Sequence, residues 1–255
     1  MQHFETLKKK DHYDSKELPT SAMNYNGIWI EELIDGYYTL KVEGREMIAP
    51  DVQIQNTSIG GVVSNQRIPS RKLKVTFKLE NHNPDLLLTD FRNIVNELYA
   101  EEDVPIYFND ERDVFYYGRF SGASEIDGAI YEIVSDFEIT CADPRRYSQA
   151  ELFINDVVNK DFRYNQRPSR IELKLAKNGK VSVTNTKQTI TIDTQLSVND
   201  SVVIDFDNGK ILVNGQNKTS FLSLTSDFEN FILRKGQIIT SNNGTCKTYF
   251  REVTF

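Results

Sequence analysis

The chain has 255 residues, 39% of them hydrophobic and 11% aromatic, a composition typical of a folded protein with one or two domains. Its net charge of −7 is unevenly divided, because residues 1–144 carry −12 and residues 145–255 carry +5. An acidic first half disfavours tight binding to nucleic acid, since affinity for phosphate depends on Lys and Arg. No apolar run approaches the roughly 20 residues that cross a bilayer, so no membrane partner is expected.

Residues 1–26 are polar and weakly patterned, and we predict that they form an N-terminal arm that is mobile in the monomer. The first ten residues lack the apolar core of a secretory signal. Cys141 and Cys246 fall in different predicted domains, so a disulfide is not expected and a reducing compartment is favoured.

Residues 27–146 are predicted to form an α+β domain in which one helix covers a strongly bent sheet. A strand is expected over residues 37–42. Residues 71–80 alternate strictly between apolar and polar side chains, which indicates a half-buried strand. Asn83 and Pro84 then provide an N-cap and a first helical residue, and an apolar stripe at helical spacing predicts a helix up to residue 98.

Residues 104–147 read as an antiparallel meander of a short strand followed by two long ones. A polar cluster at residues 109–112 supplies the first turn, and residues 122–128 supply the second. Asp143-Pro144 ends the last strand, because proline cannot donate a hydrogen bond to a sheet. This proline marks the predicted end of the first domain.

Residues 147–255 are predicted to be all-β. Short runs of apolar and β-branched residues are separated by turn signals, which is typical of a sandwich or barrel. Asn-Gly pairs favour tight hairpin turns, because both central positions of a type I′ turn need positive φ. These signals stand at Asn178-Gly179, Asn208-Gly209, Asn214-Gly215 and Asn243-Gly244.

The order of these pieces resembles the distal tail proteins (Dit) of long-tailed phages that infect Gram-positive bacteria. An acidic turn, a tyrosine-glycine-arginine strand and a last strand ending in Asp-Pro close the first domain of that family. Here these elements are Asp110-Glu111, Tyr116 to Arg119, and Phe137 to Pro144. The hairpin at residues 201–215 and the strand at residues 168–175 resemble the family's second domain.

The resemblance implies a mostly β protein with an N-terminal ring-forming domain, a bent sheet or split barrel with one helix, at residues 27–146. A galectin-like β-sandwich would follow at residues 147–255. It also implies a homohexameric ring that joins the major tail tube protein to the tail-associated protein (Tal), with receptor-binding proteins at the periphery as a further partner. The protein would be assembled in the bacterial cytoplasm, reside at the virion tail tip, and meet DNA only in passage.

Two groups of charged residues are candidates for roles in such a ring. The only basic cluster of the first half is a candidate contact between subunits, because it can pair with an acidic neighbour: Arg67, Arg71, Lys72 and Lys74. Carboxylates are candidates for lining the channel, since they repel passing DNA: Glu31, Glu32, Asp35, Glu101, Glu102, Asp103, Asp110 and Glu111. Without such a role, the basic cluster would be a solvated strand face and the carboxylates would form an acidic outer surface.

The sequence contains no signature of a catalytic, metal or cofactor site. It lacks a Gly-x-Ser-x-Gly elbow, a phosphate-binding glycine loop, a His-Glu-x-x-His helix and a Cys-x-x-Cys pair. No enzyme activity and no cofactor are therefore expected. The alternative function is a carbohydrate-binding module for host adhesion, with Tyr164 and Tyr249 as stacking candidates, and a hydrolase with paired carboxylates ranks third.

Overall fold

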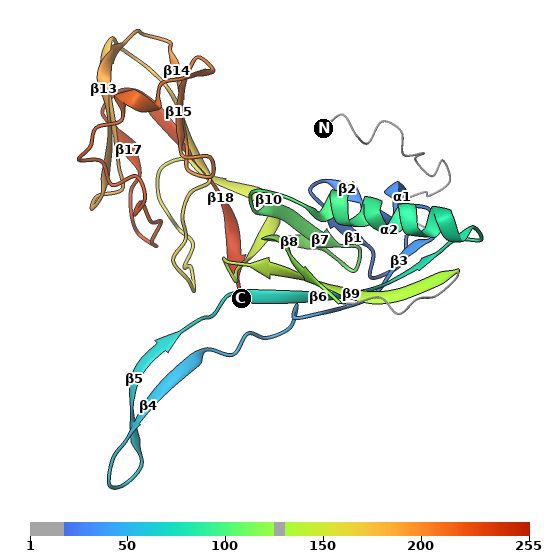
Figure 1. Ribbon diagram of the computed structural model, residues 1–255. Coiled ribbons are helices and arrows are strands. Elements are labelled where there is room, and N and C mark those ends of the chain that lie inside the picture. The colour runs from blue at the N-terminus through green and yellow to red at the C-terminus, as the bar shows by residue number, and fades with distance from the viewer. Residues whose placement is uncertain (1–17, 125–130) are drawn as a thin grey trace. The chain divides into compact units, whose positions relative to one another are not determined.

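A computed structural model describes residues 18–124 and 131–255. The chain divides into two compact units, Met1–Tyr147 together with Phe255, and Ser148–Thr254. The elements of the first unit are β1 (Met23–Tyr25), β2 (Ile28–Trp29), α1 (Ile30–Leu33), β3 (Tyr37–Glu43), β4 (Asp51–Asn56), β5 (Gly61–Arg67), β6 (Arg71–Glu80), α2 (Pro84–Leu98), β7 (Val104–Phe108), β8 (Glu111–Ala123) and β9 (Glu132–Cys141) (Figure 1).

The first unit is a bent antiparallel sheet, because β8 belongs to two runs of strands. Its first part pairs with β7, and β7 continues to β1 and β2. From Arg119 onward β8 pairs with β9, which continues to β6 and β3. Gly118 lies at this transition, where a Cβ atom would stand 2.8 Å from Cys141 Sγ. The bend therefore depends on a residue without a side chain.

Helix α2 packs its apolar stripe on the sheet, as the sequence predicted. Asn83 Oδ1 accepts a hydrogen bond from the backbone N–H of Asp85, and Pro84 opens the helix. Leu87, Ile94 and Leu98 are buried in the same core as Leu73, Val75, Phe77 and Leu79 of β6. The strict alternation of residues 71–80 is confirmed, because those four side chains face inward.

The predicted N-terminal arm is too long. Met23–Tyr25 form strand β1, which pairs with both β2 and β7, and all three side chains are buried. Leu18 and Ala22 are also buried. The mixture of polar and apolar residues hid this strand, since it pairs with distant β7. Residues 1–17 of the predicted arm, and part of the predicted turn at residues 122–128, lie outside the described residues.

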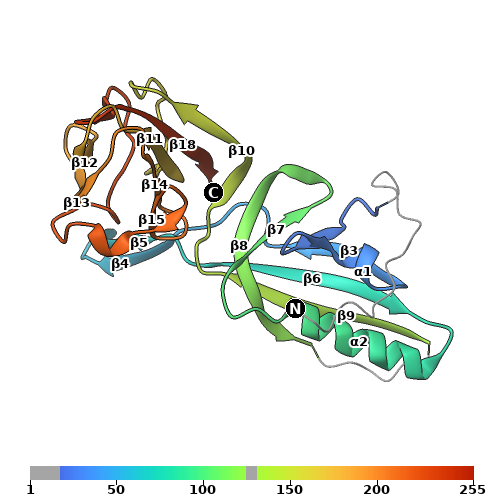
Figure 2. The same ribbon diagram turned by 90° about the horizontal axis from the view of Figure 1, so that it is seen from above.

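The second unit contains two sheets around one apolar core (Figure 2). One sheet contains β16-β15-β14-β11-β18-β10, and the other contains β13-β12-β17. Its elements are β10 (Arg146–Ile154), β11 (Arg170–Lys174), β12 (Gly179–Thr184), β13 (Thr189–Leu196), β14 (Ser201–Asp205), β15 (Lys210–Val213), β16 (Gln216–Asn217), the 3₁₀ helix η1 (Thr219–Phe221), β17 (Thr240–Ser241) and β18 (Thr245–Thr254). The mostly β prediction is confirmed, and the galectin-like subtype is consistent with this arrangement.

Two of the four Asn-Gly signals close hairpins. Asn208-Gly209 joins β14 to β15, and Asn214-Gly215 joins β15 to β16 with positive φ at both residues. The Asn178-Gly179 and Asn243-Gly244 turns instead connect strands of different sheets. A short-range hairpin signal fails there because the tertiary pairing of each strand overrides its local turn.

Candidate assembly site

The hairpin formed by β4 and β5 exposes every one of its residues to solvent. Among the described strands, β4 and β5 pair only with each other. Val52 pairs with Gln66 and Ile54 with Val63, and cross-strand partners share a face. The side chains of Val52, Ile54 and Val63 are 44%, 60% and 55% exposed. The hairpin therefore presents an apolar face that the chain itself does not cover.

A β-bulge aligns this apolar face. The register shifts between Gln53 and Ile54, where Ser64 is skipped and its Oγ donates to the carbonyl of Gln53 at 3.1 Å. Side chains alternate along a strand, so the extra residue returns Val63 to the face of Ile54. The opposite face carries the amides of Gln53, Gln55 and Asn65 together with Val62, which is 60% exposed.

Hydrogen bonds of Thr57 close the tip of the hairpin. Thr57 Oγ1 donates to the carbonyls of Ile59 and Gly60, at 2.9 and 3.1 Å. The backbone N–H of Thr57 also donates to Gly60, whose φ of +79° suits glycine. Ile59 at this tip is 93% exposed. An uncovered apolar surface of this kind is typical of a protein–protein contact.

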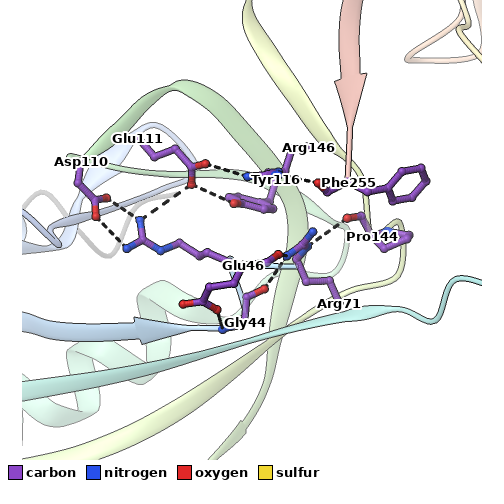
Figure 3. A network of polar contacts seen from close by, with 10 residues as sticks. Gly44, Glu46, Arg71, Asp110, Glu111, Tyr116, Pro144, Arg146 and Phe255 are labelled. Carbon is purple, nitrogen blue, oxygen red and sulfur yellow. Dashed lines mark hydrogen bonds and ion pairs between the residues drawn. The ribbon is translucent and has the colours of Figure 1, made fainter. Parts of the chain in front are cut away.

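Arg71 anchors the root of the hairpin. Its Nη1 donates to the carbonyls of Gly44 (2.6 Å) and Glu46 (3.1 Å), on the segment that leads into the hairpin. Its Nε donates to the carbonyl of Pro144 at 3.1 Å (Figure 3). Burial lowers the pKa of the Arg71 guanidinium. One side chain thus ties the hairpin root to the last residues of the first unit.

Two carboxylates of the β7–β8 turn extend this network. Asp110 accepts two hydrogen bonds from Arg45, at 2.5 and 2.8 Å, and this pairing lowers the pKa of Asp110. Glu111 accepts from the hydroxyl of Tyr116 at 3.0 Å and from Arg146 Nη1 at 3.1 Å. Figure 3 shows these groups converging between β8, the hairpin root and Pro144.

The end of the first unit is fixed by a second cluster. Asp143 accepts from Arg145 Nη2 and from the Tyr147 hydroxyl, each at 2.5 Å. The Tyr147 ring stacks on Phe115 at 5.7 Å and meets Tyr117 edge-on at 5.4 Å. Hydrogen bonds and ring contacts therefore fix the Asp-Pro-Arg-Arg-Tyr segment at the end of the first unit, and its aromatic partners lie on β8.

The predicted basic cluster is not one surface. Arg71 is only 2% exposed, so its predicted contact with another subunit is wrong; its guanidinium is used by backbone carbonyls. Arg67 lies on the hairpin and pairs with Asp51 at 3.1 Å. Lys72 and Lys74 lie on the exposed face of β6 and pair with Glu138 (3.2 Å) and Asp136 (2.9 Å). The proposal of an intersubunit contact remains for Arg67, Lys72 and Lys74.

The predicted channel carboxylates also divide. Glu31 is only 1% exposed, so it cannot line a solvent-filled channel, and that prediction is wrong. Its two oxygens accept from the backbone N–H groups of Met23 (3.3 Å) and Thr39 (3.1 Å), and burial raises its pKa. Ionic partners within the chain occupy Asp103, Asp110 and Glu111. Glu101, Glu102 and Asp35 are exposed and Glu32 is half-buried.

Replacing Arg71 by methionine should lower the free energy of unfolding by about 2–4 kcal/mol, because the carbonyls of Gly44, Glu46 and Pro144 lose the donor that joins them. Hydrogen exchange at residues 44–46 should accelerate as well. Lys72→Met is the matched control, since an exposed ion pair contributes less than about 1 kcal/mol. Equal stability of the two variants in urea unfolding would contradict the anchoring role.

Each stacking candidate for sugar binding has an arginine over one face of its ring. Arg170 lies over the ring of Tyr249 at 3.9 Å, and Lys247 lies 5.0 Å from it on β18. Arg163 lies over Tyr164 at 5.8 Å. Open aromatic faces are what a sugar stacks on, so these two rings do not favour the carbohydrate-binding alternative. Among the described residues, no three His, Cys, Asp or Glu side chains are arranged to hold a metal ion.

Residues 165–253 match a family model described as the siphovirus-type tail component, C-terminal domain. The distal tail protein of Bacillus phage SPP1 is 29% identical over 136 residues, which are 49% of this chain and 50% of that protein. Residues 165–253 therefore belong to the siphovirus-type tail component family, and the chain is similar to a siphophage distal tail protein. The sequence alignment spans half the length of that relative, and the fold comparison extends further.

Solved structures of this family and of phage baseplates share the fold. The crystal structure of SPP1 Dit, described as a paradigm of the hub adsorption apparatus in phages that infect Gram-positive bacteria, has a TM-score of 0.72 at 18% identity and covers 93% of this chain and 100% of that one. The phage P2 baseplate in its activated conformation with Ca gives 0.52 at 9% identity, covering 85% and 90%. The proteins that the chain matches are named as structural components of phage tails and baseplates.

Sequence reasoning missed the hairpin. The alternation Val52-Gln53-Ile54-Gln55 and the turn residues Ser58 to Gly61 were the available signals. Both signals were weak. The hairpin adds no side chain to the core of its own unit, and its polar positions are amides where an exposed strand commonly has charged side chains. The role of Arg71 at the hairpin root was also missed, because hydrogen bonds to three backbone carbonyls leave no pattern in a sequence.

In the described part of the chain, no helix is long and apolar enough to cross a bilayer.

Proposed function

We propose that this protein forms a hexameric ring at the phage tail tip through its N-terminal unit. The hairpin carries the proposal: Val52, Ile54 and Val63 share one exposed face on a projection that the chain itself does not cover. The family consists of tail and baseplate components, and the resemblance supplies the sixfold state. A hairpin that meets a different surface of the next copy is a heterologous contact, which generates a ring when the rotation closes.

The ring is proposed to join the major tail tube protein to the tail-associated protein, with the second units outside it. Mixing the three purified proteins tests this directly. The ring should cosediment with both partners, whereas a variant with a polar hairpin should lose both, because each partner faces a complete ring. Binding of both partners by the monomeric variant would contradict a role for the ring.

The channel is proposed to repel DNA through Glu101 and Glu102, which are exposed and lie in the bend between α2 and β7. Passing phosphates adhere to Lys and Arg, so a carboxylate surface keeps transit free of long-lived contacts. A structure of the ring with Lys and Arg on the lumen and these two carboxylates outside would overturn this part of the proposal.

A further inference from the structure

The turn between β1 and β2 is a two-residue loop made by Asn26 and Gly27. Tyr25 pairs with Ile28 directly across it, and φ is +53° at Asn26 and +85° at Gly27. Positive φ at both central residues is characteristic of the type I′ turn that Asn-Gly pairs favour. Both residues are exposed, and a Cβ atom built on Gly27 would meet no other atom within 4 Å. The surroundings of the Gly27 backbone are therefore open.

Asn26 differs from the other Asn-Gly pairs in the contacts of its side chain. Within residues 18–124 and 131–255, its side-chain amide makes no hydrogen bond, while its backbone N–H donates to the carbonyl of Pro105 at 3.0 Å. The other four asparagines are held through their amides: Asn178 by the backbone of Val198 (2.7 Å), Asn208 by Asp205 (2.8 Å), Asn214 by Ser201 and Asp200 (2.9 Å each), and Asn243 by the backbones of Ala176 and Lys177 (2.8–3.2 Å).

Asn214-Gly215 is a matched counterpart of this turn. It joins β15 to β16 with φ of +49° and +78°, and a Cβ atom on Gly215 would also meet no atom within 4 Å. The following residue and the signs of φ are thus the same at the two sites. The side chain differs, because Asn214 Oδ1 accepts from the backbone N–H of Ser201 and its Nδ2 donates to Asp200.

We propose that Asn26 is a site of spontaneous deamidation and isoaspartate formation in the folded chain. The backbone nitrogen of Gly27 attacks Cγ of Asn26, and the new N–Cγ bond closes a five-membered imide. The Cγ–Nδ2 bond breaks, and Nδ2 leaves as ammonia with the proton that the Gly27 nitrogen gives up. Water then opens the imide at either carbonyl carbon. The balance is asparagine and water to aspartate or isoaspartate and ammonia.

The side-chain contacts select among the Asn-Gly pairs, because Cγ must turn toward the nitrogen of the next residue. Glycine leaves that nitrogen unhindered, since it has no side chain. An amide held by hydrogen bonds must first break them, and the two bonds of Asn214 should slow its reaction about tenfold or more relative to Asn26.

The two products should affect the first unit differently. Aspartate adds a negative charge to an exposed turn and keeps the length of the main chain. Isoaspartate runs the main chain through the side chain and lengthens a two-residue loop by one atom. Met23 and Tyr25 of β1 lie in the core next to this loop. The melting temperature should therefore fall in step with the isoaspartate content.

Peptide mapping by mass spectrometry tests the site. The folded full chain is incubated at mildly alkaline pH until half of any one Asn-Gly pair has reacted, and it is then digested at acidic pH, which suppresses further reaction. Fragmentation separates Asn26 from Asn24, and labelling by an isoaspartyl methyltransferase reports the isoaspartate. Asn26 should reach this point first, about tenfold or more ahead of Asn214. In urea the five pairs should react at similar rates, since each asparagine precedes a glycine.

Two variants separate the chemistry from general effects of incubation. Asn26→Gly should abolish the reaction and keep the turn, because Gly-Gly also suits type I′. Its melting temperature should survive the incubation that lowers that of the unmodified chain. Asp200→Ala removes the acceptor of Asn214 Nδ2 and should raise the rate at Asn214 about threefold, with the rate at Asn26 unchanged.

Three results would overturn the inference. One is a folded chain in which another Asn-Gly pair reacts before Asn26. Another is a ratio of the Asn26 and Asn214 rates that stays the same in urea, because the fold would then select neither site. The third is an equal loss of melting temperature in the unmodified chain and Asn26→Gly, which would remove the effect of isoaspartate on β1. None of these results depends on whether the chain forms a ring.

Discussion

Serine at positions 52, 54 and 63 should convert the ring into folded monomers. Burying a Val or Ile side chain fully contributes about 1.5–3 kcal/mol, and these side chains are about half exposed before docking. Each therefore contributes about 1 kcal/mol at the interface, and the three together change affinity roughly 100-fold. A closed ring repeats the contact at every subunit. The loss of binding free energy therefore adds up over all contacts of the ring.

The opposite face of the same hairpin provides the control. Gln53, Gln55 and Asn65 replaced by serine change the same number of strand residues but leave the apolar face intact. This variant should assemble, and both should keep the melting temperature of the unmodified monomer, since the hairpin contributes no buried side chain to the core. Light scattering measures the mass in each case. Assembly of the variant with a polar hairpin face would remove the hairpin from the interface.

Glu31→Ala should lower the free energy of unfolding by about 3–5 kcal/mol. The carboxylate bridges two strands by accepting from Met23 and Thr39, and its loss leaves both buried N–H groups without an acceptor. The free energy of unfolding of Glu31→Gln should lie between those of Glu31→Ala and the unmodified chain. The glutamine amide keeps one oxygen acceptor but places an NH₂ donor against the other backbone N–H. Glu32→Ala, the neighbouring half-buried residue, is the control.

The difference in unfolding free energy between the unmodified chain and Glu31→Gln should depend on pH with a defined sign. Burial raises the pKa of Glu31 above its usual value of 4.5, so the folded state binds the proton more tightly than the unfolded state. The contribution of this titration to stability is fully present below pH 4.5 and is lost as pH rises through the folded pKa. The unmodified chain should therefore gain stability relative to Glu31→Gln as pH falls from 7 toward 4.5. Urea unfolding at several pH values measures it, and a constant difference would contradict the raised pKa.

Local patterns predicted the elements that build the core. The alternation in residues 71–80 and the capped stripe of α2 were sufficient, because one face of each element is buried in its own unit. Strand β1 escaped, since its three residues are stabilised by pairing with β7 about 80 residues later. A pattern of side chains along a short segment does not contain its distant strand partner.

The candidate site was harder to predict for the same reason. Arg71 stands in an alternating strand with two exposed lysines, Lys72 and Lys74, and nothing in that spacing distinguishes a buried arginine that binds carbonyls. Glu31 is adjacent to Glu32 in sequence but lies on the inner side of α1. Both assignments depended on contacts between segments far apart in the chain. The sequence therefore placed Arg71 and Glu31 in the first unit but could not show that both side chains are buried.

The mass of the full chain in solution tests the central claim most directly. Light scattering over a range of concentrations, followed by negative-stain imaging of the largest species, distinguishes a closed ring from a monomer. The proposal predicts a single species of six copies with sixfold rings, which disappears when Val52, Ile54 and Val63 are replaced by serine. A chain that remains at 29.4 kDa at every concentration, and also with its tail tube partner present, would contradict it.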